Sequence, residues 1–266
     1  MAASLSAPTT REIARGALYL VGLAVVFRAI HALVGNPMTS TILGAVVVSF
    51  VVARAGVNNE ATNRASVLRA LRAAACALAV VAAAVIAALV AGGRLQLVFP
   101  GATLVLSLGE AAAVGYRDEL WLHGIPLACA WRAGVRGPVA VAYGALASAA
   151  VVALEPGATL PGVLLTLAAG AFFTVLWQRT RDGWAPIGAH FAWAWGSEAL
   201  IGGELFDLTS PIGRLARGLG ASGVLAWIGI AGFAVLTLLV ARVFPDSDDK
   251  PRRSSRKKRR AMGKSR

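Results

Sequence analysis

The sequence is built largely from apolar stretches of about 20 residues, and these stretches limit the folds open to the chain more than any other feature. A helix needs about 20 apolar residues to cross a hydrocarbon core of about 30 Å. Eight stretches can be drawn, at approximately residues 14–34, 40–58, 70–92, 98–130, 137–154, 160–178, 184–202 and 222–243. Because hydrophobic residues make up 57% of the chain and charged residues only 15%, we expect an all-α polytopic membrane protein with about eight transmembrane helices. The fourth stretch is too long for one straight span, so we expect it to be broken or tilted.

Basic residues gather on alternate sides of these stretches, and their distribution predicts an orientation. If the odd-numbered stretches run outward, the cytoplasmic side receives most of the basic residues between the spans: Arg11, Arg15, Arg54, Arg64, Arg69, Arg72, Arg132, Arg136, Arg179 and Arg181. The positive-inside rule then predicts a multi-pass protein with both termini in the cytoplasm. The bias toward Ala, Arg, Gly and Val indicates a bacterial chain, so we expect it in the cell (inner) membrane.

The formal net charge of +13 is unevenly placed, because the C-terminal segment carries ten of the 26 basic residues. We expect residues 1–245 to form one integral membrane helical domain and residues 246–266 to form a basic, disordered cytoplasmic tail. Next to a final membrane helix, such a run favours contact with anionic lipid headgroups over binding of nucleic acid. Cys76 and Cys129 both fall in apolar stretches, so they predict neither a disulfide framework nor a zinc site.

Two polar clusters interrupt the apolar stretches. The first is Arg117-Asp118-Glu119-Leu120-Trp121-Leu122-His123-Gly124, and the second is His190-Phe191-Ala192-Trp193-Ala194-Trp195-Gly196. An ionised side chain at mid-membrane costs roughly 2.5–3.5 kcal/mol, so each cluster indicates a functional site. On a helix, Glu119 and His123 share one face, whereas Asp118 points about 100° away. A carboxylate and an imidazole on one face can activate water and stabilise an oxyanion.

A structural interpretation of the same residues stays open. In it, Asp118 or Glu119 pairs with Arg117 at an interfacial helix end, and His123 snorkels. His190 is then a packing residue, and its aromatic neighbours form an interface belt.

Both clusters carry a resemblance to a known family. The segment Asp118-Glu119-Leu120-Trp121-Leu122-His123-Gly124 resembles the first motif of the CPBP family of intramembrane proteases, usually EExxxR followed by Gly. This family includes the CAAX prenyl endopeptidases. The segment 188–196 resembles its late HxxxN motif, and the similarity covers roughly residues 100–215. The resemblance implies an eight-helix membrane fold in which a glutamate activates water, assisted by histidines and an asparagine.

The chain departs from the family pattern at four places. Asp118 stands where the first glutamate is usual, and His123 stands where the arginine is usual. The middle FxxxH motif aligns near residues 148–152, which places Val152 at its histidine. Ala194 stands where the late asparagine is usual. These departures leave two possibilities: a divergent protease in which His123 or Glu155 supplies part of the missing polarity, or a catalytically inactive protein that binds a peptide or partner.

The leading hypothesis is an intramembrane glutamic-type endopeptidase acting on a membrane-anchored protein or peptide. Its expected catalytic residues are Glu119 and Asp118 for water and His190 and His123 for water and oxyanion. Removal of a C-terminal sorting segment is the expected reaction, and neither a metal nor another cofactor is expected. Other polar residues that can line the same site are Arg28, His31, Glu110, Glu155 and Glu198, although Glu155 is expected rather to cap the turn before Pro156.

Overall fold

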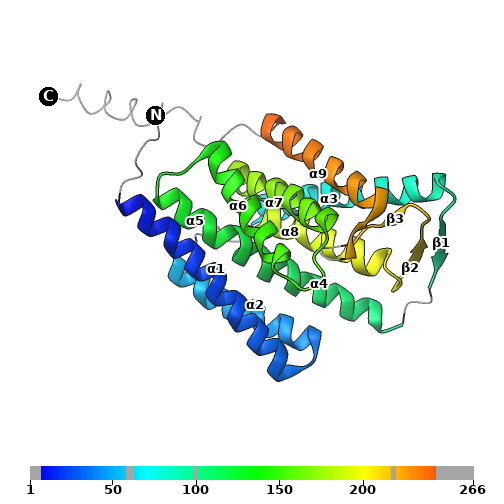
Figure 1. Ribbon diagram of the computed structural model, residues 1–266, viewed down its shortest axis with the longest axis horizontal. Coiled ribbons are helices and arrows are strands. Elements are labelled where there is room, and N and C mark those ends of the chain that lie inside the picture. Colours follow the sequence, from blue (N-terminus) through cyan, green and yellow to red (C-terminus); the bar gives the residue numbers. More distant parts are fainter. Residues whose placement is uncertain (1–6, 58–62, 99–100, 217–219, 244–266) are drawn as a thin grey trace.

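The computed structural model describes residues 7–57, 63–98, 101–216 and 220–243, and these residues are mainly helical (Figure 1). Six helices correspond to apolar stretches read from the sequence: α1 (Ala7–Val34), α2 (Pro37–Ala55), α3 (Arg64–Val90), α6 (Gly137–Ala153), α7 (Leu160–Thr180) and α9 (Gly223–Val243). By length and hydropathy, α1, α2, α3, α7 and α9 can each cross a membrane. The all-α polytopic membrane fold is therefore confirmed.

The two stretches that carry the polar clusters are not regular helices. The fourth stretch consists of α4 (Thr103–Glu119), a π-helix η1 (Leu120–Gly124) and α5 (Ile125–Arg132). The seventh consists of α8 (Trp184–Ala194) and a second π-helix, η2 (Trp195–Leu200). Short π segments inside α-helices occur frequently at functional sites. The fourth stretch, expected to be broken or tilted, is a continuous helical run in which a π-helical segment begins directly after Glu119.

Local signals in the sequence set several helix boundaries. Asn36 caps α2 by accepting a hydrogen bond from the Thr39 N–H at 2.9 Å, and Thr159 caps α7 by accepting one from the Gly162 N–H at 3.2 Å. Gly56 ends α2 in the left-handed conformation with φ of 66°, which suits a residue without a side chain. These caps supply partners for backbone groups that a helix end leaves unpaired.

The basic helix ends that the sequence places on one side of the membrane meet at one end of the molecule. Arg132 at the end of α5 donates to Glu12 of α1 at 2.8 Å and to the carbonyl of Ala55 at the end of α2 at 2.6 Å. Near the start of α3, Arg69 pairs with the buried Asp182 at 2.8 Å, in the turn between α7 and α8. The alternating direction of the helices is thereby the one that the sequence predicts.

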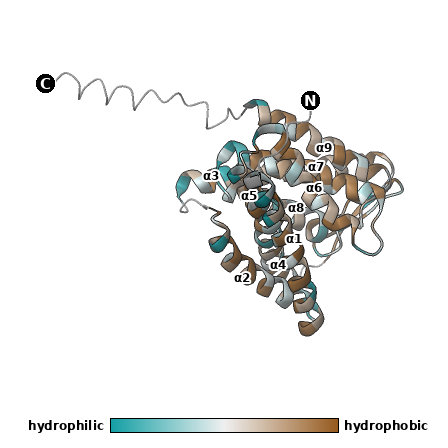
Figure 2. Cartoon of the chain, turned by 60° about the vertical axis from the view of Figure 1, so that its left-hand side comes forward, coloured by the Kyte–Doolittle hydropathy of each residue, from teal (hydrophilic) through white to brown (hydrophobic). Residues whose placement is uncertain are grey.

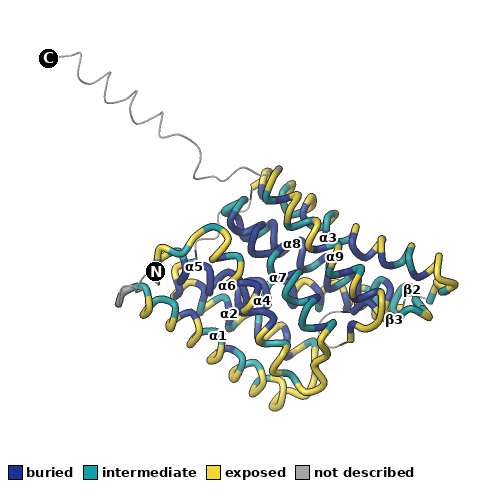
Figure 3. Tube along the Cα trace, turned by 45° about the horizontal axis from the view of Figure 1, so that its top comes forward, coloured by how far each residue is buried: buried dark blue, intermediate teal, exposed yellow. Residues whose placement is uncertain are grey.

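The inside of the fold is formed by α7 and α8, whereas α1 is exposed along much of its length (Figure 3). Glycine permits the closest helix contacts: a Cβ at Gly144 of α6 would collide with Thr174 of α7. Large apolar side chains cover much of the outside, for example Leu18, which is 73% exposed, and Phe50, which is 72% exposed. Figure 2 shows that hydrophobic residues, in brown, predominate along the long helices. Such a surface suits a hydrocarbon solvent.

A small sheet lies at the other end of α3 and was not predicted. Its strands β1 (Arg94–Leu97) and β2 (Phe206–Thr209) are antiparallel, with Arg94 opposite Thr209. A short strand β3 (Gly213–Arg214) bridges to the residues before α9. Because each strand has four residues or fewer and pairs with a distant segment, no periodic pattern announces the sheet in the sequence.

Candidate active site

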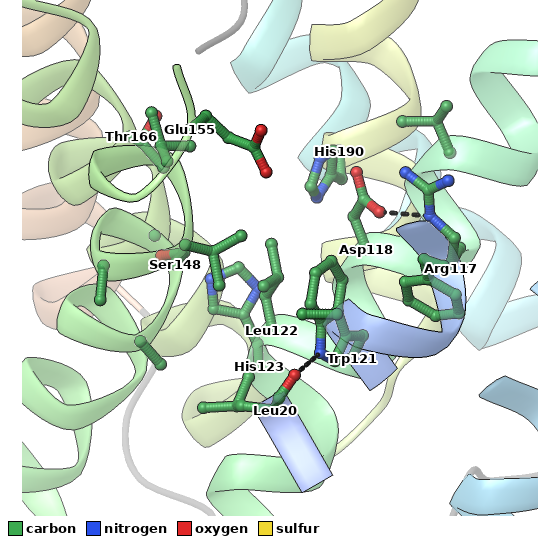
Figure 4. Close-up of a pocket in the computed structure, with 18 of the residues that line it drawn as sticks. Leu20, Arg117, Asp118, Trp121, Leu122, His123, Ser148, Glu155, Thr166 and His190 are labelled. Carbon is green, nitrogen blue, oxygen red and sulfur yellow. Dashed lines mark hydrogen bonds and ion pairs between the residues drawn. The ribbon is translucent and has the colours of Figure 1, made fainter. Parts of the chain in front are cut away.

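Both polar clusters face one cavity of about 910 Å³, lined by α1, the start of α2, α4, α6, α7 and α8 with their π segments (Figure 4). Most of its lining is apolar. The polar and charged lining residues are Arg28, His31, Ser40, Thr41, Glu110, Arg117, Asp118, His123, Ser148, Glu155, Thr166, His190 and Glu198. The structure therefore brings the two polar clusters together at one site.

Glu119 holds the two clusters together. Its Oε2 lies 3.0 Å from Nδ1 of His190, and its Oε1 accepts a hydrogen bond of 2.7 Å from the indole of Trp177. Nδ1 of His123 lies 3.2 Å from Oε1, within ion-pairing distance but without the alignment of a hydrogen bond. Glu119 has no exposed surface, and the cavity is lined by its neighbours and not by Glu119 itself. Its carboxylate therefore orients two imidazoles from behind the cavity wall.

A close helix contact explains how residues 71 positions apart come within hydrogen-bonding distance. Gly115 of α4 packs directly on the backbone of α8, where a Cβ at this position would lie 2.7 Å from the nitrogen of Phe191. Glu119 lies one turn beyond Gly115, and His190 precedes Phe191. The missing side chain at Gly115 thus lets the carboxylate and the imidazole meet.

Phe173 of α7 fixes the rings of both histidines. Its ring stacks on His190 with centroids 4.7 Å apart and planes 5° apart, and it meets His123 edge-on at 5.7 Å. Nε2 of His123 is buried and has no hydrogen-bond partner among the described residues. A Cβ at Gly170 would lie 3.4 Å from this nitrogen and would collide with the Ser148 hydroxyl. Nε2 of His123 therefore faces a part of the cavity that glycine keeps open.

Asp118 lines the cavity, whereas Glu119, about 100° away around the helix, does not. Its Oδ1 accepts a hydrogen bond of 2.6 Å from Nε of Arg117, and Figure 4 shows the carboxylate beside His190. The structural interpretation is therefore right about the Arg117 pair. It is wrong about His123, because this side chain is only 1% exposed and does not snorkel.

The departures from the family motifs leave apolar groups. Val152 lines the cavity where the family has a histidine. Ala194 is 2% exposed and packs against Ala111 and Val114 of α4, where the family has an asparagine. Of the two residues expected to supply the missing polarity, His123 reaches Glu119, whereas Glu155 has a different partner.

All five weaker candidates, Arg28, His31, Glu110, Glu155 and Glu198, line the cavity. Nη2 of Arg28 donates to Oε1 of Glu155 at 2.8 Å, and Nδ1 of His31 lies 3.2 Å from the Ser40 hydroxyl. The expected capping role of the Glu155 side chain is wrong. Its carboxylate turns to Arg28 on α1, and only its backbone takes part in the turn: the N–H donates to the Val152 carbonyl at 3.0 Å, and the carbonyl accepts from Ala158 at 3.1 Å.

Sequence reasoning missed Trp177 and Phe173. Both lie in α7, in a stretch without a charged residue or histidine, and such aromatics usually indicate packing. The available hint was the predicted depth in the membrane. Trp177 lies near the predicted cytoplasmic end of the sixth stretch, and the two polar clusters lie toward the predicted cytoplasmic ends of the fourth and seventh stretches.

Within the described ranges, no group of three or more His, Cys, Asp or Glu side chains can hold a metal ion. A site that works without metal stays a prediction.

Comparison with known proteins gave one similarity. No curated protein and no solved structure was found to match. Residues 100–196 match the family described as type II CAAX prenyl endopeptidase Rce1-like. The match covers a little over a third of the chain, from α4 to the start of η2, and it contains both polar clusters. The resemblance of this segment to the CPBP proteases is therefore confirmed: residues 100–196 are similar to the Rce1-like type II CAAX prenyl endopeptidases.

Proposed function

We propose that the chain is an intramembrane glutamic-type endopeptidase that hydrolyses a peptide bond of a membrane-anchored protein or peptide. The observation that carries the proposal is the buried carboxylate of Glu119 bonded to His190, which faces the cavity. Buried charged groups in a membrane fold are costly, so their retention around a cavity indicates chemistry. The similarity to an endopeptidase family points to the same reaction class.

The geometry suggests a carboxylate–imidazole pair as the water-activating unit. Because Nδ1 of His190 is engaged with Glu119, Nε2 is the nitrogen that can take a proton from water in the cavity. The carboxylate fixes the tautomer and stabilises the imidazolium that forms, as in other carboxylate–imidazole pairs. The oxygen of the water then bonds to the peptide carbonyl carbon, and the C–N bond breaks as His190 returns the proton to the leaving amine. Glu119 has no exposed surface and does not line the cavity, so it acts through His190 as a positioning residue and not as the direct water activator that the sequence predicts.

Two further residues serve the same step. Asp118 lies at the cavity beside His190, held by Arg117, and its carboxylate can accept the second hydrogen bond of the water. Nε2 of His123 has no hydrogen-bond partner among the residues described. When this nitrogen carries a proton, it can donate a hydrogen bond to the oxyanion that forms from the peptide carbonyl. An oxyanion donor of this kind is worth roughly 100- to 1,000-fold in rate. His123 thereby replaces the amide that Ala194 cannot supply.

The finer parts of the proposal concern substrate and setting. We propose removal of a C-terminal sorting segment in a bacterial cell membrane, with both termini of the protein in the cytoplasm. Reporter fusions after residue 57 and after residue 92 test the orientation, because only the second position is expected outside the cytoplasm. The basic segment 246–266, proposed to bind anionic lipid headgroups, lies outside the described residues. Its test is binding of a synthetic peptide of this segment to vesicles with and without anionic lipid.

The proposal is tested by comparing C-terminal fragments of membrane proteins in the native host. The strains are wild type, a deletion, and strains carrying only Glu119→Gln or His190→Ala at equal protein level. Glu110→Gln is the matched control, because Glu110 is also a glutamate of α4 that lines the cavity but has no contact with either histidine. We expect the same uncut precursors in the deletion, Glu119→Gln and His190→Ala strains, and normal processing in the Glu110→Gln strain.

A second function has support from two residues. Val152 and Ala194 leave apolar groups where the family has polar ones, which favours a catalytically inactive protein that binds a peptide or partner. In that case the deletion changes the host phenotype, while the Glu119→Gln strain behaves as wild type.

A further inference from the structure

The cavity has an open side between α1 and α6. Apart from Pro37 and Glu198, the cavity-lining residues that are also exposed lie on these two helices. On α1 they include Ala17, Val21 and Val25, spaced by four residues and therefore on one face. At the end of α6 they are Ala150 and, directly after the helix, Leu154, which is 80% exposed. We call these two facing rows of small and aliphatic side chains the seam.

The seam is closed by polar contacts at its two ends. At one end, the Tyr143 hydroxyl of α6 donates to the carbonyl of Ile13 in α1 at 3.5 Å, and Gly16 lies so close that a Cβ there would lie 2.8 Å from the same oxygen. At the other end, the ion pair of Arg28 with Glu155 joins α1 to the turn after α6 at 2.8 Å. The 12 residues from Gly16 to Arg28 span about 18 Å of helix at 1.5 Å per residue. The seam is thus an opening of this length between α1 and α6. We call the Arg28–Glu155 ion pair at one end of it the clasp, and the opening itself the window.

Helix α1 is held in place from the other side. The indole of Trp121 donates to the carbonyl of Leu20 at 3.1 Å, and the ring of Phe27 meets Trp121 edge-on at 4.9 Å. These contacts join α1 to η1, next to the histidine cluster. Helix α1 therefore remains part of the site whether the seam is open or closed.

We propose that the seam is the entrance through which an apolar, membrane-embedded segment of the substrate passes from the bilayer into the cavity, and that Arg28 and Glu155 form the clasp that parts to admit it. This inference rests on the proposed function. The window lies within the apolar span Thr9–Val34 of α1, so whatever reaches it comes from the hydrocarbon. The two charges at the seam neutralise each other, and a charged segment would have to give up its solvation there. An uncharged, apolar segment is the partner that fits.

The clasp is suited to opening because its side chains are partly exposed, 62% for Arg28 and 39% for Glu155. Because Arg28 lies near the end of α1 and Glu155 lies in the turn after α6, each side chain can turn toward the membrane–water interface when the pair separates. An extended segment of about five residues fills an 18 Å window. Beyond the window, the cavity floor carries His190 and Asp118, and Figure 4 shows the Glu155 carboxylate directed into the cavity from the side opposite Asp118. A segment that enters beside the clasp therefore reaches the reacting groups.

The test closes the clasp chemically in the full-length protein, in proteoliposomes. Arg28→Cys and Glu155→Cys are combined with Cys76→Ala and Cys129→Ala, which remove both native cysteines. A short bifunctional thiol reagent with a reducible link joins the two positions. The probe is a biotinylated leucine–alanine peptide of about 20 residues with a photoreactive leucine at its centre, long enough to span the bilayer. Adducts are located by mass spectrometry.

We expect adducts at the buried cavity-lining residues Leu122, Leu165 or Phe173 in the open protein, a loss of at least fivefold when the clasp is linked, and recovery after reduction. The matched control links Glu12→Cys to Arg132→Cys, a pair also separated by 2.8 Å that joins α1 to α5 and leaves the seam free. This control must not reduce the adducts. Adducts confined to the lipid-facing Leu18, or unchanged by linking the clasp, overturn the entrance.

Cleavage is scored separately on host precursors that accumulate in the deletion strain. If the probe enters but no precursor is cut by the wild-type protein, the entrance stands and the protease proposal fails. If precursors are cut equally well with the clasp linked, the protease proposal stands and the entrance fails.

Discussion

Replacing Trp177 with phenylalanine removes the indole N–H that donates to Oε1 of Glu119 at 2.7 Å and keeps an aromatic ring at the position. A hydrogen bond to a charged group contributes about 1.5–3 kcal/mol. If that energy holds the Glu119–His190 pair in its reactive geometry, its loss lowers kcat roughly 10- to 150-fold, at about 1.4 kcal/mol per factor of ten. Trp177 does not line the cavity, so KM stays unchanged.

The assay measures the cleavage rate of a host precursor by purified protein in proteoliposomes, together with thermal unfolding in detergent. Trp184→Phe is the matched control, because Nε1 of Trp184 is buried without a hydrogen-bond partner in the described part of the chain. It loses the same atoms but no hydrogen bond, and we expect cleavage within about twofold of wild type. The reasoning is refuted if Trp177→Phe cleaves at the wild-type rate while Glu119→Gln is inactive, or if Trp184→Phe loses as much activity.

Three further outcomes are expected. Gly170→Ala lowers stability by about 1–3 kcal/mol, because the new Cβ meets the Ser148 hydroxyl, and the added Ser148→Ala change restores part of the loss in a double-mutant cycle followed by thermal unfolding. Gly115→Ala forces α4 away from α8 and lowers both stability and precursor cleavage. In the control Gly109→Ala, the nearest atom to the new Cβ lies 3.8 Å away, and stability rises by about 0.5–1 kcal/mol. A fall in stability of equal size in both variants contradicts the packing argument. Purified protein is expected to carry no stoichiometric metal by elemental analysis and to keep its cleavage rate after chelation. Loss of a bound metal together with activity would show that the reaction depends on a metal.

The sequence alone determined the helices and their order. Length and apolarity are local properties, so each of the eight stretches corresponds to a helical segment, and the overlong fourth stretch contains a π-helical segment after Glu119. The spacing of Glu119 and His123 also fixed their shared face, because positions four apart meet on any helix. The basic helix ends meet at one end of the fold for a similarly simple reason. Consecutive spans run in opposite directions, so every second connection lies on the same side.

Only the tertiary structure decided what each acid does. Glu119 turns to His190 and Trp177, 71 and 58 residues away, whereas Asp118 turns to the cavity. Both directions depend on how α4 is rotated and on how closely Gly115 lets it approach α8, and neither is encoded in the spacing along one helix. The pairing of Arg28 with Glu155 across 127 residues is of the same kind. A polar group in an apolar environment must find a partner, but the partner it finds is set by the packing of helices far apart in the chain.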